Sequence, residues 1–327
     1  MRPRVYVTQP IALSAAKRLR EVARVTINPD SSRPLPKKNL LAAVPRTDVL
    51  FSLLHDRVDR DVLAANPKLR AVCSMAITPD AIDVAAATAR GIPVTVVPPI
   101  VGEATADLNF GLIIAVARRM REGDRLLRQG GFPGGQSNHL AGAAVSGKVL
   151  GLIGGGGRIG RAVAKRAHGF SMEVLYWSPR RKPARDEQDF GIAYVPFDDL
   201  LARSDFISLH PPLNEETRHM ISDREFALMK PTAFLINTAR GPIVDEAALI
   251  RALTKKRIAG AGLDVYEHEP KVAMALRKMP NVVLTPHMGS AVASLREVMA
   301  NIVVDNIVAI LDGKPPPNCI NPQVFDQ

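Results

Sequence analysis

Short apolar runs rich in β-branched residues alternate with helical patterns along almost the whole chain. The first group of expected strands is Val5–Thr8, Val22–Ile27, Val49–Leu53, Leu69–Ser74 and Pro93–Val97. The second group is Val149–Gly154, Val174–Trp177, Ile192–Val195, Phe206–Leu209, Ala233–Asn237, Ala261–Val265 and Val282–Thr285. Strands that alternate with helices favour parallel βαβ units over a sandwich or a helical bundle. The pattern therefore predicts an α/β protein with two parallel sheets, the second of them larger and doubly wound.

Helical patterns connect these strands and separate the two groups. In the first group we expect helices at Ala12–Glu21 and Asp80–Arg90, the latter ended by Gly91. Between the groups, Glu103–Arg128 has an apolar face and many arginines, which predicts one long helix crossing between domains. A last helix at Ser294–Leu311 follows the second group. If it returns the chain to the first group, one domain comprises residues 1–100 and 290–327, and the inserted domain comprises residues 101–289.

Composition sets the broad class of the protein. With 327 residues, 46% hydrophobic and 23% charged, each of two domains can bury its own core. The two cysteines, Cys73 and Cys319, are far apart and have no metal-ligand spacing, so we predict neither disulfide nor metal site and a reducing, cytoplasmic location. The first ten residues lack a signal-peptide pattern, and the longest apolar stretch, Phe110–Ala117, is too short to span a membrane.

The chain carries a formal net charge of +11, which raises the question of a polyanionic partner. Its lysines and arginines are scattered among 32 acidic residues, and aromatic residues make up only 5% of the chain. Single-strand binders interleave basic and aromatic side chains, and that arrangement is missing from this sequence. We therefore predict no nucleic-acid partner and favour a small anionic molecule.

A glycine run, Gly155-x-Gly157-x-x-Gly160, follows the apolar run Val149–Ile153 and precedes a helical pattern. In this context glycines allow a tight turn and a close approach of the backbone to a pyrophosphate, which the N–H groups of the helix N-terminus then bind. A plain flexible turn is the alternative. The strand before it and the helix after it favour a dinucleotide site.

The residue that follows the second strand of this domain bears on which dinucleotide binds. An NAD site usually has an acidic residue there, but this chain has Ser178, followed by Arg180 and Arg181. Guanidinium groups pair well with a 2′-phosphate. We therefore predict a preference for NADP(H), with NAD(H) possible; the alternative is that both arginines belong to a solvated surface.

Three polar groups follow three later strands of the same sheet: Arg240, Glu269 and His287. Ligands of open α/β sheets bind at the carboxyl ends of the strands, so all three can face one crevice. An arginine can hold a carboxylate, a histidine can exchange a proton near neutral pH, and a carboxylate beside it favours the imidazolium. Each residue alone also fits a structural role, as a loop cap, a surface acid or a core histidine.

Taken together, these stretches resemble the D-isomer-specific 2-hydroxyacid dehydrogenase family over nearly the whole chain. The matching segments are Ala104–Asp107, the glycine run, His210–Pro212 with Glu216–Arg218, Met229–Lys230, Asn237–Gly241, Gly260–Val265 with Glu269–Pro270, and Thr285–His287. The resemblance implies a Rossmann-type, doubly wound cofactor domain inserted into a smaller, flavodoxin-like α/β substrate domain, assembled as a homodimer. It also implies NAD(P)-dependent reduction of a small 2-oxo acid to a D-2-hydroxy acid, closest in character to NADPH-dependent glyoxylate and hydroxypyruvate reductases.

The resemblance also assigns roles to single residues. Arg240 would bind the carboxylate and carbonyl of the substrate, and Glu269 and His287 would form the acid–base pair, with His287 donating the proton. The expected cofactor residues are Thr105, Gly155, Gly157, Arg158, Ile159, Ser178, Arg180, Arg181, His210, Pro211, Thr217, Thr238, Ala239, Asp264 and Gly289. The substrate would also meet Ala76, Ile77 and Thr78, where the family usually has a glycine at the position of Thr78.

Two other functions share this scaffold. A dinucleotide-sensing protein resembling the C-terminal-binding corepressors would bind the cofactor without turnover, although such proteins usually carry further tails and peptide-docking surfaces. Oxidation of formate or phosphite is the other possibility. Glu269 argues against the formate type, which tends to have glutamine there, and the absence of lysine from Ser74–Asp80 argues against the phosphite type.

Overall fold

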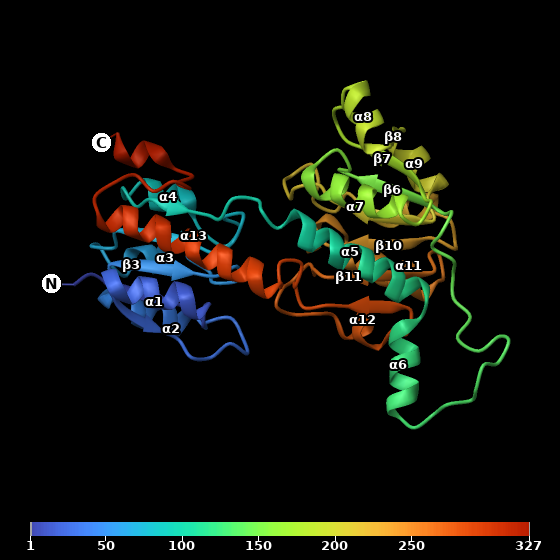
Figure 1. Cartoon of the computed structure of the whole chain (residues 1–327), viewed down its shortest axis with the longest axis horizontal. Coiled ribbons are helices and arrows are strands. Elements are labelled where there is room, and N and C mark those ends of the chain that lie inside the picture. Colours follow the sequence, from blue (N-terminus) through green and yellow to red (C-terminus); the bar gives the residue numbers. More distant parts are fainter. Residues whose placement is uncertain (1, 327) are drawn as a thin grey trace. The chain divides into compact units, whose positions relative to one another are not determined.

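The chain forms two units, each built around one parallel β-sheet (Figure 1). The computed structural model describes residues 2–326. One unit contains the residues up to Ile100 and those from Ala291 onward, and the other unit is Val101–Ser290. We call them the outer unit and the inserted unit. The outer unit is therefore discontinuous in sequence.

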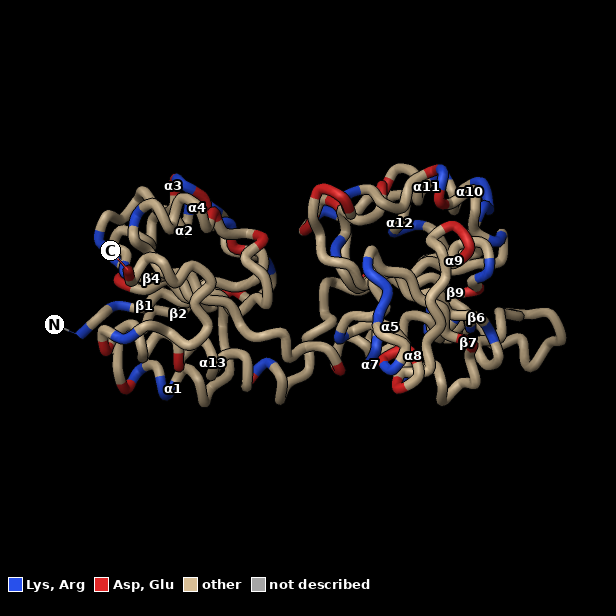
Figure 2. Tube along the Cα trace, turned by 90° about the horizontal axis from the view of Figure 1, so that it is seen from above, with Lys and Arg blue, Asp and Glu red and all other residues tan. Residues whose placement is uncertain are grey.

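The sheet of the outer unit has the strand order β2-β1-β3-β4-β5, with every pair parallel, which is the flavodoxin-like order. Its strands are β1 (Arg4–Val7), β2 (Arg24–Ile27), β3 (Val49–Ser52), β4 (Ala71–Ser74) and β5 (Val94–Thr95). Its helices are α1 (Leu13–Val22), α2 (Lys37–Ala43), α3 (Arg60–Ala64), α4 (Val84–Thr88) and α13 (Ala293–Leu311). Helices α2, α3 and α4 cover one face, and α1 and α13 cover the other (Figure 2). The central strands β3 and β4 are consequently buried along their whole length.

The sheet of the inserted unit has the order β12-β11-β10-β9-β6-β7-β8, again with every pair parallel. Its strands are β6 (Val149–Ile153), β7 (Glu173–Trp177), β8 (Ala193–Tyr194), β9 (Phe206–Leu209), β10 (Phe234–Asn237), β11 (Gly260–Leu263) and β12 (Val282–Leu284). Its helices are α5 (Gly102–Ala117), α6 (Met120–Arg128), α7 (Arg158–His168), α8 (Ala184–Phe190), α9 (Phe197–Arg203), α10 (Asp223–Leu228), α11 (Glu246–Thr254) and α12 (Met274–Lys278). This is the doubly wound Rossmann arrangement extended by one strand.

Two apolar cores, one on each face, hold the inserted unit together. Phe110 and Ile113 of α5 pack with Val163 of α7 on one face, while Phe226 of α10 and Leu249 of α11 pack on the other. Chain order reverses between the neighbouring strands β6 and β9, because β7 follows on one side of β6 and β10 on the far side of β9. Open α/β sheets bind ligands at the carboxyl ends of strands at such a switch point.

The helix predicted at Glu103–Arg128 is two helices, so that prediction was wrong. The backbone turns at Arg119, whose φ is +52°, and α6 begins directly after it. The carbonyl of Ala117 accepts a hydrogen bond from Ala143 N at 2.8 Å. The guanidinium of Arg119 donates two hydrogen bonds, of 2.9 and 2.8 Å, to the Glu122 carboxylate. A segment more than 20 residues away in sequence thus contacts the end of α5.

Two further boundaries also differ from the prediction. The helix expected over Asp80–Arg90 covers only Val84–Thr88, because the Asp83 side chain caps it by accepting a hydrogen bond from Ala86 N at 2.9 Å. Val22, expected to open a strand, is the last residue of α1, and β2 begins at Arg24. Within residues 2–326, every helix is too short or too polar to cross a lipid bilayer.

Candidate active site

The turn after β6 needs glycine at Gly154. Its φ is +78°, a left-handed conformation that side chains disfavour. A Cβ built on it would lie 2.7 Å from Pro211 N and 2.8 Å from the carbonyl carbon of His210. The turn after β6 and the turn after β9 therefore pack backbone against backbone at the switch point.

Close packing of helix α7 on the same turn explains the third glycine of the run. A Cβ on Gly160 would lie 2.5 Å from the carbonyl oxygen of Gly155, which is far inside van der Waals contact. Gly157 is the N-cap residue of α7, so the first N–H groups of the helix, which have no acceptor within the helix itself, lie at this turn. These features fit a pyrophosphate, which binds where N–H groups converge and the backbone can approach closely.

Replacing Gly160 with alanine should lower the free energy of unfolding by about 1–3 kcal/mol, because the new methyl group forces α7 away from the Gly155 backbone. Gly111, in the middle of α5, supplies the matched control, since nothing lies within 4 Å of its Cβ position. Gly111→Ala should instead stabilise the protein by about 0.5–1 kcal/mol through helix propensity. Urea unfolding of both variants measures this, and equal stabilities would contradict the described packing.

His210 is a second sign of a ligand at the switch point. Both of its ring nitrogens are buried, and neither has a hydrogen-bond partner within the described part of the chain. Burial lowers the pKa of His210 to about 3, so the ring is neutral. An unpartnered buried imidazole costs folding free energy, and a bound molecule with polar groups would supply the missing hydrogen bonds.

The basic side chains in the loop after β7 differ in their partners and positions. Ser178 Oγ donates a hydrogen bond of 2.6 Å to the carbonyl of Arg180. The guanidinium of Arg181 binds the Glu187 carboxylate through two hydrogen bonds of 2.8 Å each. The aliphatic stem of Lys182, a residue that the sequence did not single out as a site residue, lies over the glycine turn: a Cβ on Gly156 would meet its Cε at 2.4 Å.

A buried carboxylate, Asp264, ties together the segments after β11 and β12. Its Oδ1 accepts from Met288 N at 2.8 Å and from the Thr285 hydroxyl at 2.6 Å, and its Oδ2 accepts from Gly289 N at 2.9 Å. Burial raises the pKa of Asp264 against the opposing effect of these hydrogen bonds. Thr105, in the first turn of α5, donates to the carbonyl of Gly289 at 3.4 Å. Three predicted cofactor residues, Thr105, Asp264 and Gly289, therefore lie together.

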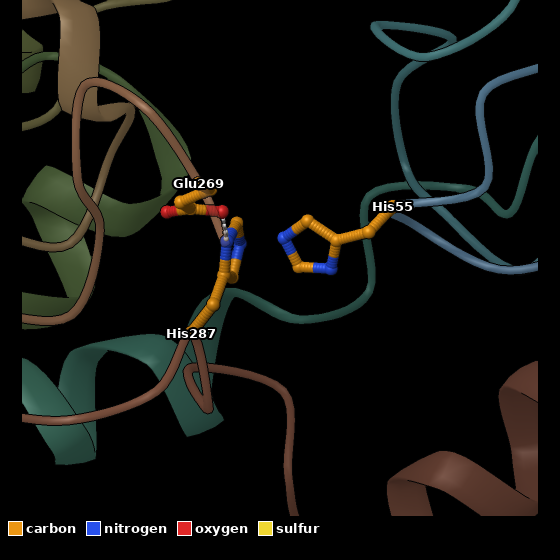
Figure 3. Close-up of side chains that lie close together, drawn as sticks. All are labelled: His55, Glu269 and His287. Carbon is orange, nitrogen blue, oxygen red and sulfur yellow. Dashed lines mark hydrogen bonds and ion pairs between the residues drawn. The ribbon is translucent and has the colours of Figure 1, made fainter. Parts of the chain in front are cut away.

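Glu269 and His287 form a hydrogen-bonded pair (Figure 3): Nδ1 of His287 lies 2.8 Å from Oε2 of Glu269. Because an ionised carboxylate only accepts, this hydrogen bond places a proton on Nδ1. The other carboxylate oxygen, Oε1, accepts from Tyr266 N at 2.9 Å, so the carboxylate is fixed at both ends. Both side chains are about four-fifths buried, with exposed fractions of 20% and 18%.

Backbone strain accompanies this pair. The φ of His287 is +52°, in the left-handed region that only a few per cent of non-glycine residues adopt, among which histidine, asparagine and aspartate are enriched. Its N–H donates to the Asp264 carbonyl at 2.8 Å, and the Tyr266 hydroxyl donates to the carbonyl of Thr285 at 2.8 Å. Such strain persists only where surrounding bonds over-determine it, and it concentrates at functional sites.

Arg240 follows β10 at the same edge of the sheet. Asn237 braces its loop: Nδ2 donates to the Arg240 carbonyl at 3.0 Å, and Oδ1 accepts from Ala239 N at 3.0 Å. A Cβ on Gly241 would lie 1.9 Å from the Tyr266 carbonyl, so the loops after β10 and β11 are in direct contact. Since β10, β11 and β12 are neighbours, Arg240, Glu269 and His287 all follow the carboxyl ends of adjacent strands.

The remaining predicted cofactor residues of this unit serve visible structural contacts. The Thr217 hydroxyl donates to the Pro212 carbonyl at 2.7 Å and so closes its own loop. The Thr238 hydroxyl accepts from Asn109 Nδ2 at 2.9 Å, and the same amide nitrogen lies 2.8 Å from Ser208 Oγ. Asn109 is fully buried in α5 and holds the ends of β9 and β10 together. Arg158 and Ile159 are the first two residues of α7.

The predicted substrate residues Ala76, Ile77 and Thr78 belong to the outer unit, where they follow β4. The N–H of Ala76 donates to Ser74 Oγ at 3.2 Å, and the Thr78 hydroxyl donates to Asp80 at 2.9 Å. Asp80 thus holds the hydroxyl of the residue that stands where the family usually has glycine. The role of this loop in holding a substrate carboxylate stays a prediction.

Sequence reasoning missed Asn109, Lys182, Glu187, Asn237 and Tyr266. For two of them a signal existed: Asn237 directly precedes the loop of Arg240, and Tyr266 stands three residues before Glu269. Asn109 and Glu187 are polar residues in helical stretches, and only the fold brings them to the ends of other elements. The sequence around these two residues therefore did not indicate which elements they contact.

Comparison with known proteins agrees with this geometry. The family described as "D-isomer specific 2-hydroxyacid dehydrogenase, NAD binding domain" matches residues 110–289. A glyoxylate reductase of Thermococcus litoralis is 45% identical over 329 residues, which cover 99% of this chain and 98% of that protein.

Solved structures show the same similarity over both units. A glyoxylate reductase from Paecilomyes thermophila superposes with a TM-score of 0.80 at 32% identity, covering 97% of this chain and 98% of that one. An NADPH-dependent glyoxylate/hydroxypyruvate reductase from Sinorhizobium meliloti superposes with a TM-score of 0.79 at 31% identity, covering 98% of each chain.

Proposed function

Because the chain belongs to the D-isomer-specific 2-hydroxyacid dehydrogenase family of NAD(P)-dependent oxidoreductases, we propose that it reduces glyoxylate and closely related small 2-oxo acids, with NADPH as the preferred reductant. The observation that carries the proposal is the Glu269–His287 pair, bonded at 2.8 Å beside the loop of Arg240. Assembly as a homodimer, which the resemblance implies, stays a prediction.

The three polar groups divide the work of carbonyl reduction. A reduced nicotinamide dinucleotide, when bound, supplies the hydride that the carbonyl carbon accepts. The guanidinium of Arg240 holds the substrate carboxylate and polarises the carbonyl oxygen, where negative charge develops. His287 donates a proton from Nε2 to that oxygen, and Glu269 holds the ring in position through Nδ1.

The proposed cofactor preference rests on the loop after β7. Ser178 stands where an NAD site usually has an acidic side chain, so no carboxylate at that position repels a 2′-phosphate. Arg180 is exposed in the same loop, and Lys182 lies over the glycine turn. The NADPH-dependent relative from Sinorhizobium meliloti supports the same choice.

A substrate panel tests both parts of the proposal. Glyoxylate, hydroxypyruvate, pyruvate, phenylpyruvate and sugar-derived 2-oxo acids are each assayed with NADPH and NADH by the loss of absorbance at the nicotinamide band. We expect the largest kcat/KM with glyoxylate or hydroxypyruvate, and at least about a tenfold advantage of NADPH, the value of one hydrogen bond to a charged group. A clear NADH preference would refute the cofactor assignment. Tight cofactor binding without turnover on any acid would instead favour a dinucleotide sensor.

A further inference from the structure

The three cations after β7 occupy different electrostatic environments. The guanidinium of Arg181 forms a bidentate ion pair with Glu187, in which Nε and Nη2 each lie 2.8 Å from a separate carboxylate oxygen. The side chain of Arg180 is exposed. A bidentate pair holds both charges in a defined geometry, so Arg181 is less available to a ligand than Arg180.

Glu187 lies in α8, and Arg181 is not the only side chain that donates a hydrogen bond to it. Its Oε1 also accepts a hydrogen bond of 2.7 Å from the Tyr176 hydroxyl, and that hydroxyl accepts from Lys182 N at 2.8 Å. The hydrogen bonds from Arg181, first, and from the Tyr176 hydroxyl lower the pKa of Glu187 to about 2, so the carboxylate is ionised at every physiological pH. The guanidinium of Arg181 additionally lies 5.6 Å from the centre of the Tyr194 ring. Glu187 thus connects β7 and α8 with the C-terminal end of this loop, at Arg181 and Lys182.

We propose that Glu187 tunes cofactor specificity through charge: it neutralises Arg181, which leaves Arg180 and Lys182 as the cations that bind the 2′-phosphate. The inference rests on the proposed NADPH dependence and refines it, because the sequence alone assigned Arg180 and Arg181 the same role. In this arrangement Arg181 and Glu187 contribute no net charge at the phosphate position.

If Arg181 and Glu187 cancel each other's charge, a double-mutant cycle should show opposite effects of the two single variants on affinity for a 2′-phosphate. Glu187→Gln keeps oxygen and nitrogen atoms for Tyr176 and Arg181 but removes the negative charge, so affinity for a 2′-phosphate should rise about 3- to 10-fold. Arg181→Gln leaves Glu187 unneutralised, and the affinity should fall by a similar factor. The double variant removes both charges and should bind within about twofold of the unaltered protein.

Calorimetric titration with 2′,5′-ADP and 5′-AMP reads out this cycle on the full chain. The two probes differ only in the 2′-phosphate, and neither contains nicotinamide, so the result is independent of whether any 2-oxo acid is reduced. Arg180→Gln should weaken 2′,5′-ADP binding by at least about tenfold and leave 5′-AMP binding unchanged. Glu173→Gln is the matched control, because Glu173 pairs with Arg203 at 2.9 Å at the opposite end of β7. It should change neither affinity.

Two outcomes overturn the proposal. If the double variant binds 2′,5′-ADP as weakly as Arg181→Gln, then Arg181 contacts the phosphate directly, and Glu187 does not neutralise its charge there. If Glu187→Gln loses affinity for 2′,5′-ADP, then Glu187 does not oppose phosphate binding. An unfolded variant is recognised by lost 5′-AMP binding and is replaced by Glu187→Asp, whose retained charge should leave the 2′,5′-ADP affinity near its original value.

Discussion

Replacing His287 with asparagine should lower kcat for glyoxylate reduction by about 10²- to 10⁴-fold, the range that a general acid contributes. Asparagine is the right substitution because the backbone at this position has a φ of +52°, which asparagine tolerates better than alanine. Its amide can still hydrogen-bond to Glu269, but it cannot release a proton near neutral pH. Steady-state kinetics with saturating NADPH measure the loss.

The loss must be separated from a change in folding or cofactor binding. The thermal unfolding midpoint and the affinity for NADPH, followed by nicotinamide fluorescence, should both stay near those of the unaltered protein. Near-full turnover by His287→Asn with glyoxylate or with its best 2-oxo acid would require another proton donor.

The second large effect is expected at Arg240. Arg240→Gln should lower kcat/KM by about 10²- to 10³-fold, because in the proposed mechanism one guanidinium both binds the substrate carboxylate and stabilises charge on the carbonyl oxygen. The loop itself should survive, since Asn237 holds it through the backbone carbonyl of residue 240 rather than through the guanidinium. The measurement is kcat/KM for glyoxylate.

Two comparisons make this prediction specific to a guanidinium. Arg240→Lys keeps the positive charge without the planar fork, so it should recover only part of the activity. Low concentrations of guanidinium chloride should partly rescue a smaller variant, Arg240→Ala, by supplying the missing group. Activity of Arg240→Gln within a few-fold of the unaltered protein would remove Arg240 from the mechanism.

Much of the fold was predictable because strand signals are local. The strand at Phe206–Leu209 was predicted at its observed limits, and β6 at Val149–Ile153 was predicted one residue too long. Short apolar, β-branched runs bounded by turn residues are typical of buried parallel strands. The break between α5 and α6 was not predictable, because the segment that contacts the carbonyl of Ala117 lies at Gly142–Ala143. No pattern within the helix itself carries that information.

For the candidate site, the sequence was informative about chemistry and less so about geometry. Parallel strands end at a common edge, which is why Arg240, Glu269 and His287 were expected near one crevice. The bond between Nδ1 and Oε2, the φ of His287 and the support from Tyr266 depend on the loops after β11 and β12 meeting. Such contacts join residues that have no fixed spacing in the sequence, so a sequence pattern does not reveal them.

The sequence by itself determined the alternation of strands and helices, the glycine turn before α7 and the side chains available for reduction of a 2-oxo acid. Those features follow from periodicity and residue type, which are local properties. Only the tertiary structure decided which charged side chains pair with each other. It paired Arg181 with Glu187 and left both ring nitrogens of His210 buried without a partner in the described chain. The physical reason is that electrostatic and hydrogen-bond energies depend on distance and burial, which the order of residues does not specify.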